Sequence, residues 1–254
     1  MRIVRFTRSG RVGYGIYEDD YVHVVHNPFS PKKTGKRFDI HDMRLLCPMT
    51  PSKIVCAGLN YVDHAAEMNM PIPDEPVIFL KPPSSALDPG GTIIYPDMAH
   101  QVDHEAELAV VIGAVAKDVS CADAPRFILG YTCFNDVTAR DLQRRDSQWT
   151  RAKSFDTFGP FGPWVETDID PTNVRVEAFL NGETRQSSST ANLIFPVVKL
   201  VSFISKIMTL LPGDIIATGT PPGIGPMKVG DEIEVRISGI GGLINRVAAA
   251  APAA

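Results

Sequence analysis

The stretch that decides the fold is DHEAELAVVIG, residues 103–113. Its second half, Leu108–Ile112, is continuously apolar, which is typical of a strand that is buried on both faces. Glu105 and Glu107 lie two residues apart, so in an extended chain both carboxylates point to one face. Two buried acids on one face are costly unless a cation lies between them. The stretch therefore predicts a buried strand with a cation site, the alternative being a solvated or salt-bridged acidic face.

A third acid, Asp136, lies in the similar apolar context GYTCFNDVTARD. Mg²⁺ and Mn²⁺ prefer oxygen ligands and usually keep coordination positions open for water or substrate. Such a cation is the candidate for the site at Glu105 and Glu107, and Asp136 is a further acid that these residue types make of interest. The six histidines show no zinc-ligand spacing, and GTPPGIG (219–225) lacks the Lys-Ser/Thr that a P-loop requires.

Short β-like runs dominate the chain, including KIVCAG, PVIFLK, VRVEAFL and DEIEVRI. The N-terminal runs alternate between apolar and polar residues and are divided by Ser9-Gly10 and Asp19-Asp20, which are turn signals. Pro48 marks a plausible boundary. The division that we predict is a small β-rich N-terminal domain, a catalytic domain and a disordered tail, at residues 1–48, 49–247 and 248–254.

Helices are expected to be few. Ser120 with Asp123 resembles a capping box before a short helix that ends near Gly130. The clearest helix is PVVKLVSFISKIMTLL (196–211), with a proline in its first turn and apolar residues at helical spacing. The fold class is therefore mainly β with few helices, of the α+β type.

Composition excludes several classes of protein. The 254 residues are 44% hydrophobic and 21% charged, with a net charge of −4, so no basic footprint suggests a nucleic-acid partner. No apolar stretch approaches the roughly 18 residues that span a bilayer, and the start MRIVRFTRSG has no signal-peptide core. The four cysteines have no CxxC spacing. We expect a cytoplasmic protein with reduced thiols, without membrane or nucleic-acid partners.

Two further segments combine polar residues in ways that suggest catalysis. In GLNYVDHAAEM, His64 and Glu67 share a face of a helical turn, so Glu67 can orient and polarise His64; the alternative is a surface pair. In TARDLQ, Arg140 and Gln143 follow Asp136 by about one turn.

Two more segments offer anion-binding groups. Lys153 lies among aromatic and glycine residues in WTRAKSFDTFGPFGP, where it either reaches solvent or binds an anion. The turn in GDIIATGTPPGIG presents backbone N–H groups near Gly219 and the hydroxyl of Thr220, which can bind a carboxylate. The alternative there is a simple tight turn.

These segments together resemble the fumarylacetoacetate hydrolase family over nearly all of residues 50–247. The resemblance rests on six motifs in order: LNYVDHAAE, PVIFLKPPSS, DHEAELAVVIG, NDVTARDLQ, AKSFDTFGPFGP and LPGDIIATGTPPGIG. It implies a mainly β, mixed-sheet roll that holds one Mg²⁺ or Mn²⁺ and assembles as a homodimer. The segment CAGLNY lacks the fourth acid of fumarylacetoacetate hydrolase itself, which argues against identity with that enzyme.

The resemblance also implies roles for single residues. The family's metal ligands fall on Glu105, Glu107 and Asp136. Lys153 matches the lysine beside the metal, and Arg140 and Gln143 match substrate- or oxyanion-binding positions. Gly219 and Thr220 match the loop that receives the substrate carboxylate, and His64 with Glu67 matches the lid dyad of the acylpyruvate-cleaving branch. For hydrolysis, Lys153 and Gln143 are the expected donors to the tetrahedral oxyanion.

The activity that we expect is metal-dependent cleavage of a C–C bond in a 2,4-diketo acid through a metal-stabilised enolate. In that reaction His64, oriented by Glu67, activates the attacking water. The same enolate chemistry serves an isomerase of 2-hydroxy-dienedioates, which SFDTFGPFGP also resembles, or an oxaloacetate decarboxylase in aromatic-acid catabolism. A non-catalytic member of the fold is a further alternative.

Overall fold

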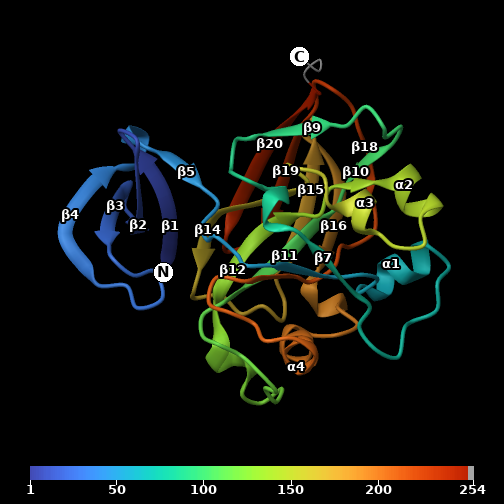
Figure 1. Ribbon diagram of the computed structural model, residues 1–254, viewed down its shortest axis with the longest axis horizontal. Helices are drawn as coiled ribbons and strands as arrows, with labels where there is room; N and C mark the ends of the chain where they lie inside the picture. The colour runs from blue at the N-terminus through green and yellow to red at the C-terminus, as the bar shows by residue number, and fades with distance from the viewer. Residues whose placement is uncertain (251–254) are drawn as a thin grey trace.

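Strand β11 lies inside the largest of three sheets in the computed structural model, which describes residues 1–250 (Figure 1). This mixed sheet has the order β4-β3-β2-β1-β14-β12-β11-β17-β6-β7, and β5 and β8 pair at its side. Its strands are β1 (Arg2–Arg8), β2 (Arg11–Glu18), β3 (Tyr21–Val25), β4 (Lys33–Asp39), β5 (Arg44–Leu46), β6 (Ile54–Ala57), β7 (Ile78–Lys81), β8 (Ala86–Leu87), β11 (Ala106–Ile112), β12 (Ile128–Asn135), β14 (Gly159–Glu166) and β17 (Ile215–Ala217).

Side chains of β11 alternate between two cores, because successive residues of a strand point to opposite faces. Leu108, Val110 and Ile112 belong to the main hydrophobic cluster, whereas Ala109 and Val111 belong to a second one. All seven residues of the strand are buried. The continuous apolar run thus correctly predicts a strand that is covered on both faces.

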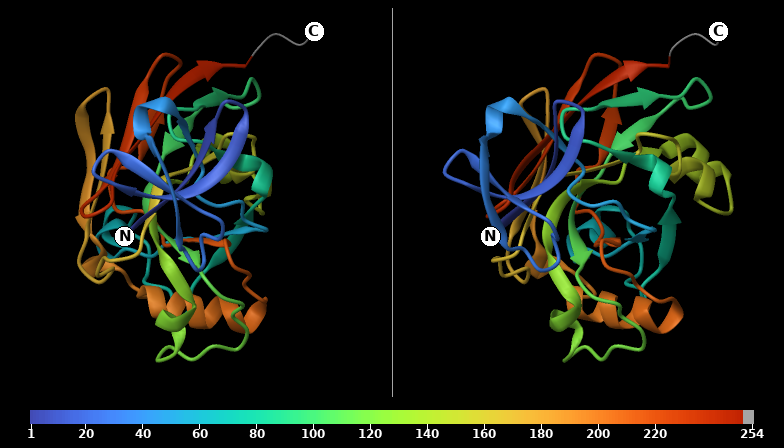
Figure 2. Two further views of the ribbon diagram at one scale, coloured as in Figure 1. Left: turned by 90° about the vertical axis from the view of Figure 1, so that its left-hand side faces the viewer. Right: turned by 60° about the vertical axis from the view of Figure 1, so that its left-hand side comes forward.

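A second layer packs against β11 and β12 (Figure 2). It is a five-stranded sheet with the order β16-β15-β19-β20-β9, and a small three-stranded sheet, β13-β10-β18, lies at its side. The main cluster fills the space between the layers with Val176, Val235 and Leu243 from the second sheet. These strands are β9 (Thr92–Tyr95), β10 (Val102–His104), β13 (Thr138–Ala139), β15 (Arg175–Leu180), β16 (Glu183–Ser189), β18 (Gly225–Met227), β19 (Glu232–Ile237) and β20 (Gly241–Ala249).

The N-terminal strands β1 to β5 form the blue lobe at the left of Figure 1. The turns at Ser9-Gly10 and Asp19-Asp20 are confirmed, and all four residues have positive φ, as tight hairpin turns require. Antiparallel pairing of β1 with β14 joins the lobe to the large sheet. Its treatment as a separate domain ending at residue 48 stays a prediction.

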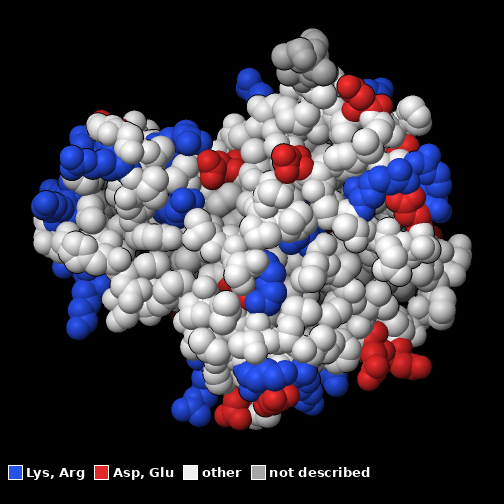
Figure 3. All heavy atoms as spheres, viewed as in Figure 1, with Lys and Arg blue, Asp and Glu red and all other residues white. Residues whose placement is uncertain are grey.

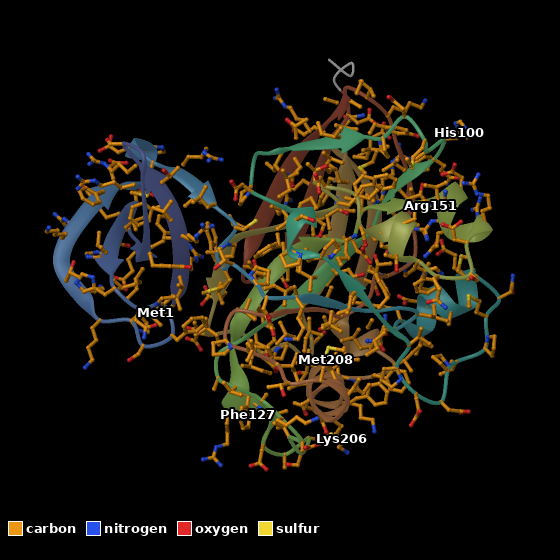
Figure 4. The ribbon with its side chains drawn as sticks, viewed as in Figure 1. Met1, His100, Phe127, Arg151, Lys206 and Met208 are labelled. Carbon is orange, nitrogen blue, oxygen red and sulfur yellow. The ribbon has the colours of Figure 1, made fainter. Side chains whose placement is uncertain are left out.

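Four α-helices occur among the described residues: α1 (Val62–Glu67), α2 (Arg140–Arg145), α3 (Thr150–Lys153) and α4 (Val197–Ile207). The predicted helix at 196–211 is shorter than expected, because the chain leaves α4 at Met208, two residues after Lys206 in its last turn (Figure 4). None of the helices in residues 1–250 is long and apolar enough to cross a membrane.

Two expectations about local structure were wrong. The segment after Ser120 forms only a 3₁₀ turn (Ala124–Phe127), because β12 begins at Ile128 and pairs with β11. The tail begins later than residue 248, because Ala248 and Ala249 still pair with β9 in parallel. The rest of the predicted disordered tail, residues 251–254, lies outside the described residues.

Helix α4 provides a matched test of the core. Ile204 is fully buried in the main cluster, whereas Ile207, one turn later, is 54% exposed. Ile204→Ala should lower the free energy of unfolding by about 2–5 kcal/mol through lost burial and a residual cavity. Ile207→Ala should change it by no more than about 0.5 kcal/mol. Urea unfolding of both variants measures the difference, and equal effects would contradict this packing of α4.

Candidate metal centre

Three carboxylates meet where β10 ends and β11 begins. Glu105 lies in the break between these strands, Glu107 is on β11, and Asp136 directly follows β12. The N–H of Asp136 donates to the carbonyl oxygen of Glu105 (2.9 Å), which places the two residues side by side. One oxygen from each carboxylate lies within 4.8 Å of the others, and all three residues are buried. Glu105 is thus outside the expected strand, yet the acids converge.

Two buried lysines donate hydrogen bonds to these acids. The Nζ of Lys153, the last residue of α3, donates to Glu105 (2.8 Å) and to Asp136 (2.7 Å). Lys81, at the end of β7, donates to the other oxygen of Asp136 and to the carbonyl oxygen of Val137 (2.9 Å). Both ammonium groups are consequently committed to groups of the protein.

Arg140 pairs with acids as well. Its Nε donates to Asp103 (2.8 Å), its Nη2 donates to Glu105, and its Nη1 donates to the amide oxygen of Gln143 (2.5 Å). The planar fork thus orients a carboxylate of the triad. Its expected contact with a substrate stays a prediction. Gln143 has its oxygen turned to Arg140, which leaves the amide NH₂ as its donor end.

The pKa values of the two glutamates are shifted in opposite directions. Burial raises the pKa of Glu105, but Lys153 and Arg140 overcome this effect and hold it well below its usual range. Burial, reinforced by the charges of Asp136 and Glu105, raises the pKa of Glu107 well above its ordinary value. Glu107 accepts one backbone hydrogen bond, from Gly219 (2.7 Å). Without a cation, burial and the neighbouring acids therefore favour the protonated form of Glu107.

The donor set fits a hard divalent cation. It consists of carboxylate oxygens alone, which Mg²⁺ and Mn²⁺ prefer. With every group ionised, the buried cluster has one negative charge in excess, and protonation of Glu107 removes it. A divalent cation can take the place of that proton. The cluster comprises the acids Asp103, Glu105, Glu107 and Asp136 and the cations Lys81, Arg140 and Lys153.

The predicted dyad forms on α1. The Nδ1 of His64 lies 2.8 Å from an oxygen of Glu67, whose other oxygen accepts the N–H of Gly223 (3.0 Å). A carboxylate can only accept, so Nδ1 carries the hydrogen and Nε2 is the nitrogen that is left for proton transfer. His64 is 8% exposed. The backbone N–H of Gly223 thus fixes the carboxylate that orients the histidine.

The turn after β17 is tied to β11. Gly219 donates its N–H to Glu107, as described above, and the hydroxyl of Thr220 donates to the carbonyl oxygen of Ala106 (2.9 Å). Gly219 has φ +96°, and an added Cβ would lie 2.7 Å from the side chain of Asn60. Two donors expected for a substrate carboxylate are therefore used within the protein. The substrate-binding role of this turn stays a prediction.

The three acids and His64 line one pocket of about 230 Å³, together with Arg140, Gln143, Lys153 and Thr220. Glu67 lies behind His64 and is not among the lining residues. Apolar side chains complete the wall of the pocket, among them Met68, Phe79 and Trp149. Charged residues gather on the surface near α2 and α3, where Arg151 lies (Figures 3 and 4). A larger hollow of about 950 Å³ lies along β15, β16 and β19, but the clustered acids are not among its lining residues.

Comparison with known protein families identifies the family of this chain. Residues 53–248 match the family described as fumarylacetoacetate (FAA) hydrolase C-terminal, and residues 1–48 match an N-terminal family described as Rv2993c-like. The first match covers most of the chain. The chain belongs to the fumarylacetoacetate hydrolase family.

Three similar proteins cover between 81% and 98% of this chain. A protein of Archaeoglobus fulgidus is 49% identical over 95% of this chain and 94% of its own length. The bovine mitochondrial oxaloacetate tautomerase FAHD2A is 43% identical over 81% of this chain and 70% of its own length. The crystal structure of 5-carboxymethyl-2-hydroxymuconate delta-isomerase from Mycobacterium smegmatis has a TM-score of 0.93 and 44% identity, with 98% of this chain and 100% of that chain covered.

Sequence reasoning missed several members of this family site. The motif PVIFLKPPSS by itself assigns Lys81 no role, although a lysine in an apolar run is a signal for a buried ion pair, and Lys81 is buried. Asp103 continues the two-residue spacing of Glu105 and Glu107, which is a visible signal for a third acid. Gln186 and Trp149 carried no sequence signal, because tertiary contacts alone bring them to the site.

Glu107 gives the centre a characteristic pH dependence. A raised carboxyl pKa stabilises the folded state at low pH, and this stabilisation is lost as pH rises from the unfolded value toward the raised folded value. Glu107→Gln, which cannot ionise, should therefore gain in Tm relative to wild type as pH increases from about 5 to 8 in EDTA. It should also lose Mn²⁺ binding. A Tm difference that is independent of pH would contradict the protonated state of Glu107.

Proposed function

We propose that this protein is a divalent-metal-dependent enzyme that moves a proton on a small 2-oxo acid, as a tautomerase or isomerase. The observation that carries the proposal is that His64, with Glu67 behind it, lines the same pocket of about 230 Å³ as Glu105, Glu107 and Asp136. Proton transfer next to a keto group needs a base and a positive charge near the keto oxygen. This pocket offers groups for both.

Charge supports an anionic substrate. When a divalent cation replaces the proton of Glu107, the buried cluster changes from neutral to one positive charge in excess, and a bound anion offsets that charge. The lysines and Arg140 already hold carboxylates of the protein. Recognition of a 2-oxo acid is therefore assigned to the cation and to the remaining donors of the wall.

The residues of the chain then have distinct tasks. A bound Mg²⁺ or Mn²⁺ would supply positive charge beside the keto oxygen, where negative charge develops. The Nε2 of His64 removes a proton from the carbon next to the keto group. It returns that proton to the keto oxygen in a tautomerase, or to a conjugated carbon in an isomerase. Glu67 stabilises the imidazolium while it holds that proton. Phe79, Met68 and Trp149 exclude water from the substrate.

The named relatives support proton transfer. One is an oxaloacetate tautomerase and one a hydroxymuconate delta-isomerase, and both reactions shift a proton on an oxo or hydroxy acid. The hydrogen-bond donors of the pocket also favour proton transfer over hydrolysis. Hydrolysis needs donors for a tetrahedral oxyanion, and the expected donor Lys153 already donates to two carboxylates. The homodimer expected from the family resemblance stays a proposal.

C–C hydrolysis of a 2,4-diketo acid is the second candidate. Its specific support is Gln143, whose amide NH₂ is the free end of a side chain in the pocket wall. In this version His64 deprotonates a water instead of a carbon, and Gln143 donates to the oxyanion. Decarboxylation of oxaloacetate needs neither water nor a base, so it serves as a comparison reaction.

Removal of the base separates these reactions. His64→Ala should slow tautomerisation of oxaloacetate, isomerisation of a 2-hydroxy-dienedioate and hydrolysis of acetylpyruvate, whichever occurs, by about 10²–10⁴-fold. Decarboxylation of oxaloacetate should fall less. Product identification by NMR shows which reaction the wild type performs, and Mn²⁺ affinity should stay unchanged. Equal loss in all reactions would show that His64 shapes the pocket and is not the base.

Arg144 supports a substrate with a second carboxylate. It is exposed, lines the pocket next to Gln143, and has no acidic partner within 4.0 Å in the described chain. The adjacent Arg145 pairs with Asp146 (3.9 Å) and is not among the lining residues of the pocket. A second carboxylate of a substrate bound in this pocket would pair with Arg144.

The two neighbouring arginines provide a matched test. Arg144→Gln should raise KM for a dicarboxylic oxo acid such as oxaloacetate by about tenfold, equivalent to about 1.4 kcal/mol. KM for a monocarboxylic one such as phenylpyruvate should hardly change. Arg145→Gln should leave both values unchanged. Equal effects of Arg144→Gln on both substrates would exclude recognition of a distal carboxylate.

A further inference from the structure

Gln186 of β16 links parts of the site that are far apart in sequence. It is 1% exposed and uses both ends of its amide. Its oxygen accepts from the N–H of Ala106 (2.9 Å), the residue between Glu105 and Glu107. Its NH₂ donates to the hydroxyl of Thr220 (2.8 Å) and to the carbonyl oxygen of Pro221 (2.7 Å).

These contacts settle the orientation of the amide. The N–H of Ala106 is a donor and the carbonyl of Pro221 is an acceptor, so the oxygen faces β11 and the NH₂ faces the turn. His104 lies 3.1 Å from the same oxygen through Nδ1, and Nδ1 must therefore carry its hydrogen. Gln186 thus makes four hydrogen bonds, and replacement by a different group breaks at least two of them.

The strand that carries Gln186 also supports the turn through its backbone. Gly223 has φ +92°, and an added Cβ would lie 2.1 Å from the carbonyl oxygen of Arg185. The N–H of Gly223 donates to Glu67, the partner of His64. Residues 219–223, which we call the site turn, therefore touch Glu107 at one end and the dyad at the other, with β16 beneath them.

We propose that Gln186 is a positioning residue that sets the site turn against the strand of the metal ligands. Through Ala106 it holds the strand between two triad carboxylates. Through Thr220 and Pro221 it holds the turn whose Gly219 N–H binds Glu107. It is not among the lining residues of the pocket, and it carries no charge, so Gln186→Met alters geometry without changing the charge of the cluster. The activity readout rests on the proposed function, but metal binding does not.

The chain offers a matched control in Asn245. It is 1% exposed, and its NH₂ donates to the carbonyl oxygens of Asp88 (3.1 Å) and Gly91 (3.0 Å), away from the pocket. Gln186→Glu and Asn245→Asp are the same change of one buried amide to a carboxyl. Each removes NH₂ donors from two acceptors, and both should lower Tm. Only the first change should disturb the site.

The test measures Mn²⁺ binding by EPR and oxalate binding to the Mn²⁺-loaded protein by calorimetry. Gln186→Met should weaken Mn²⁺ binding about 10–100-fold, the usual effect of removing a group that orients metal ligands. Gln186→Glu keeps the acceptor for Ala106, so it should weaken Mn²⁺ binding less than Gln186→Met does. It loses the NH₂ that donates to Thr220 and Pro221 of the site turn, so it should weaken oxalate binding by about tenfold. Asn245→Asp should change neither by more than about twofold.

A double-mutant cycle tests the route of the effect. Thr220→Val removes the hydroxyl that accepts from the NH₂ of Gln186. The double variant Gln186→Met/Thr220→Val should therefore bind Mn²⁺ no more weakly than Gln186→Met alone. Unchanged Mn²⁺ and oxalate binding in both Gln186 variants, with Tm lowered as in Asn245→Asp, would overturn the proposal. Weakened binding in a protein whose wild type converts no oxo acid would support the role of Gln186 and reject only the proposed function.

Discussion

The buried ion cluster is the interaction on which the rest of the site depends. Three carboxylates within 4.8 Å of one another repel each other, and a low-dielectric interior strengthens that repulsion. Lys153 offsets it by lying between Glu105 and Asp136, while Lys81 and Arg140 hold the outer oxygens. One negative charge would still be in excess, and burial with the neighbouring acids raises the pKa of Glu107, which favours its protonated form. A divalent cation can take the place of that proton.

This pairing of charges limits which residues of the pocket are left to bind a substrate. Cations that would otherwise bind an anionic substrate are already paired with acids of the protein. In the proposed reaction, substrate recognition is left to the metal, to Gln143 and to Arg144, and His64 moves the proton. The candidate reactions of oxo acids share one requirement, a negative charge that develops beside the cation.

Backbone groups connect the metal centre to the dyad. Gly219 and Gly223 lie in one turn and donate to Glu107 and to Glu67, respectively, so a shift of the turn moves both carboxylates. Strand β16 supports that turn from a sheet different from the one that supplies β11. The packing of the two layers therefore sets the distance between the base and the acids, which no single segment can set alone.

The sequence by itself determined the buried strand and the hairpin turns, because alternation and apolar runs are local properties of the chain. The convergence of Glu105, Glu107 and Asp136 was expected from the family resemblance and not from a local pattern. The sequence also placed His64 near Glu67, since three residues span one helical turn. Only the tertiary structure decided that Lys81 is buried and that Gln186 joins the turn to β11. Those contacts join strands from different sheets or distant segments, and no local pattern encodes how such segments pack against each other.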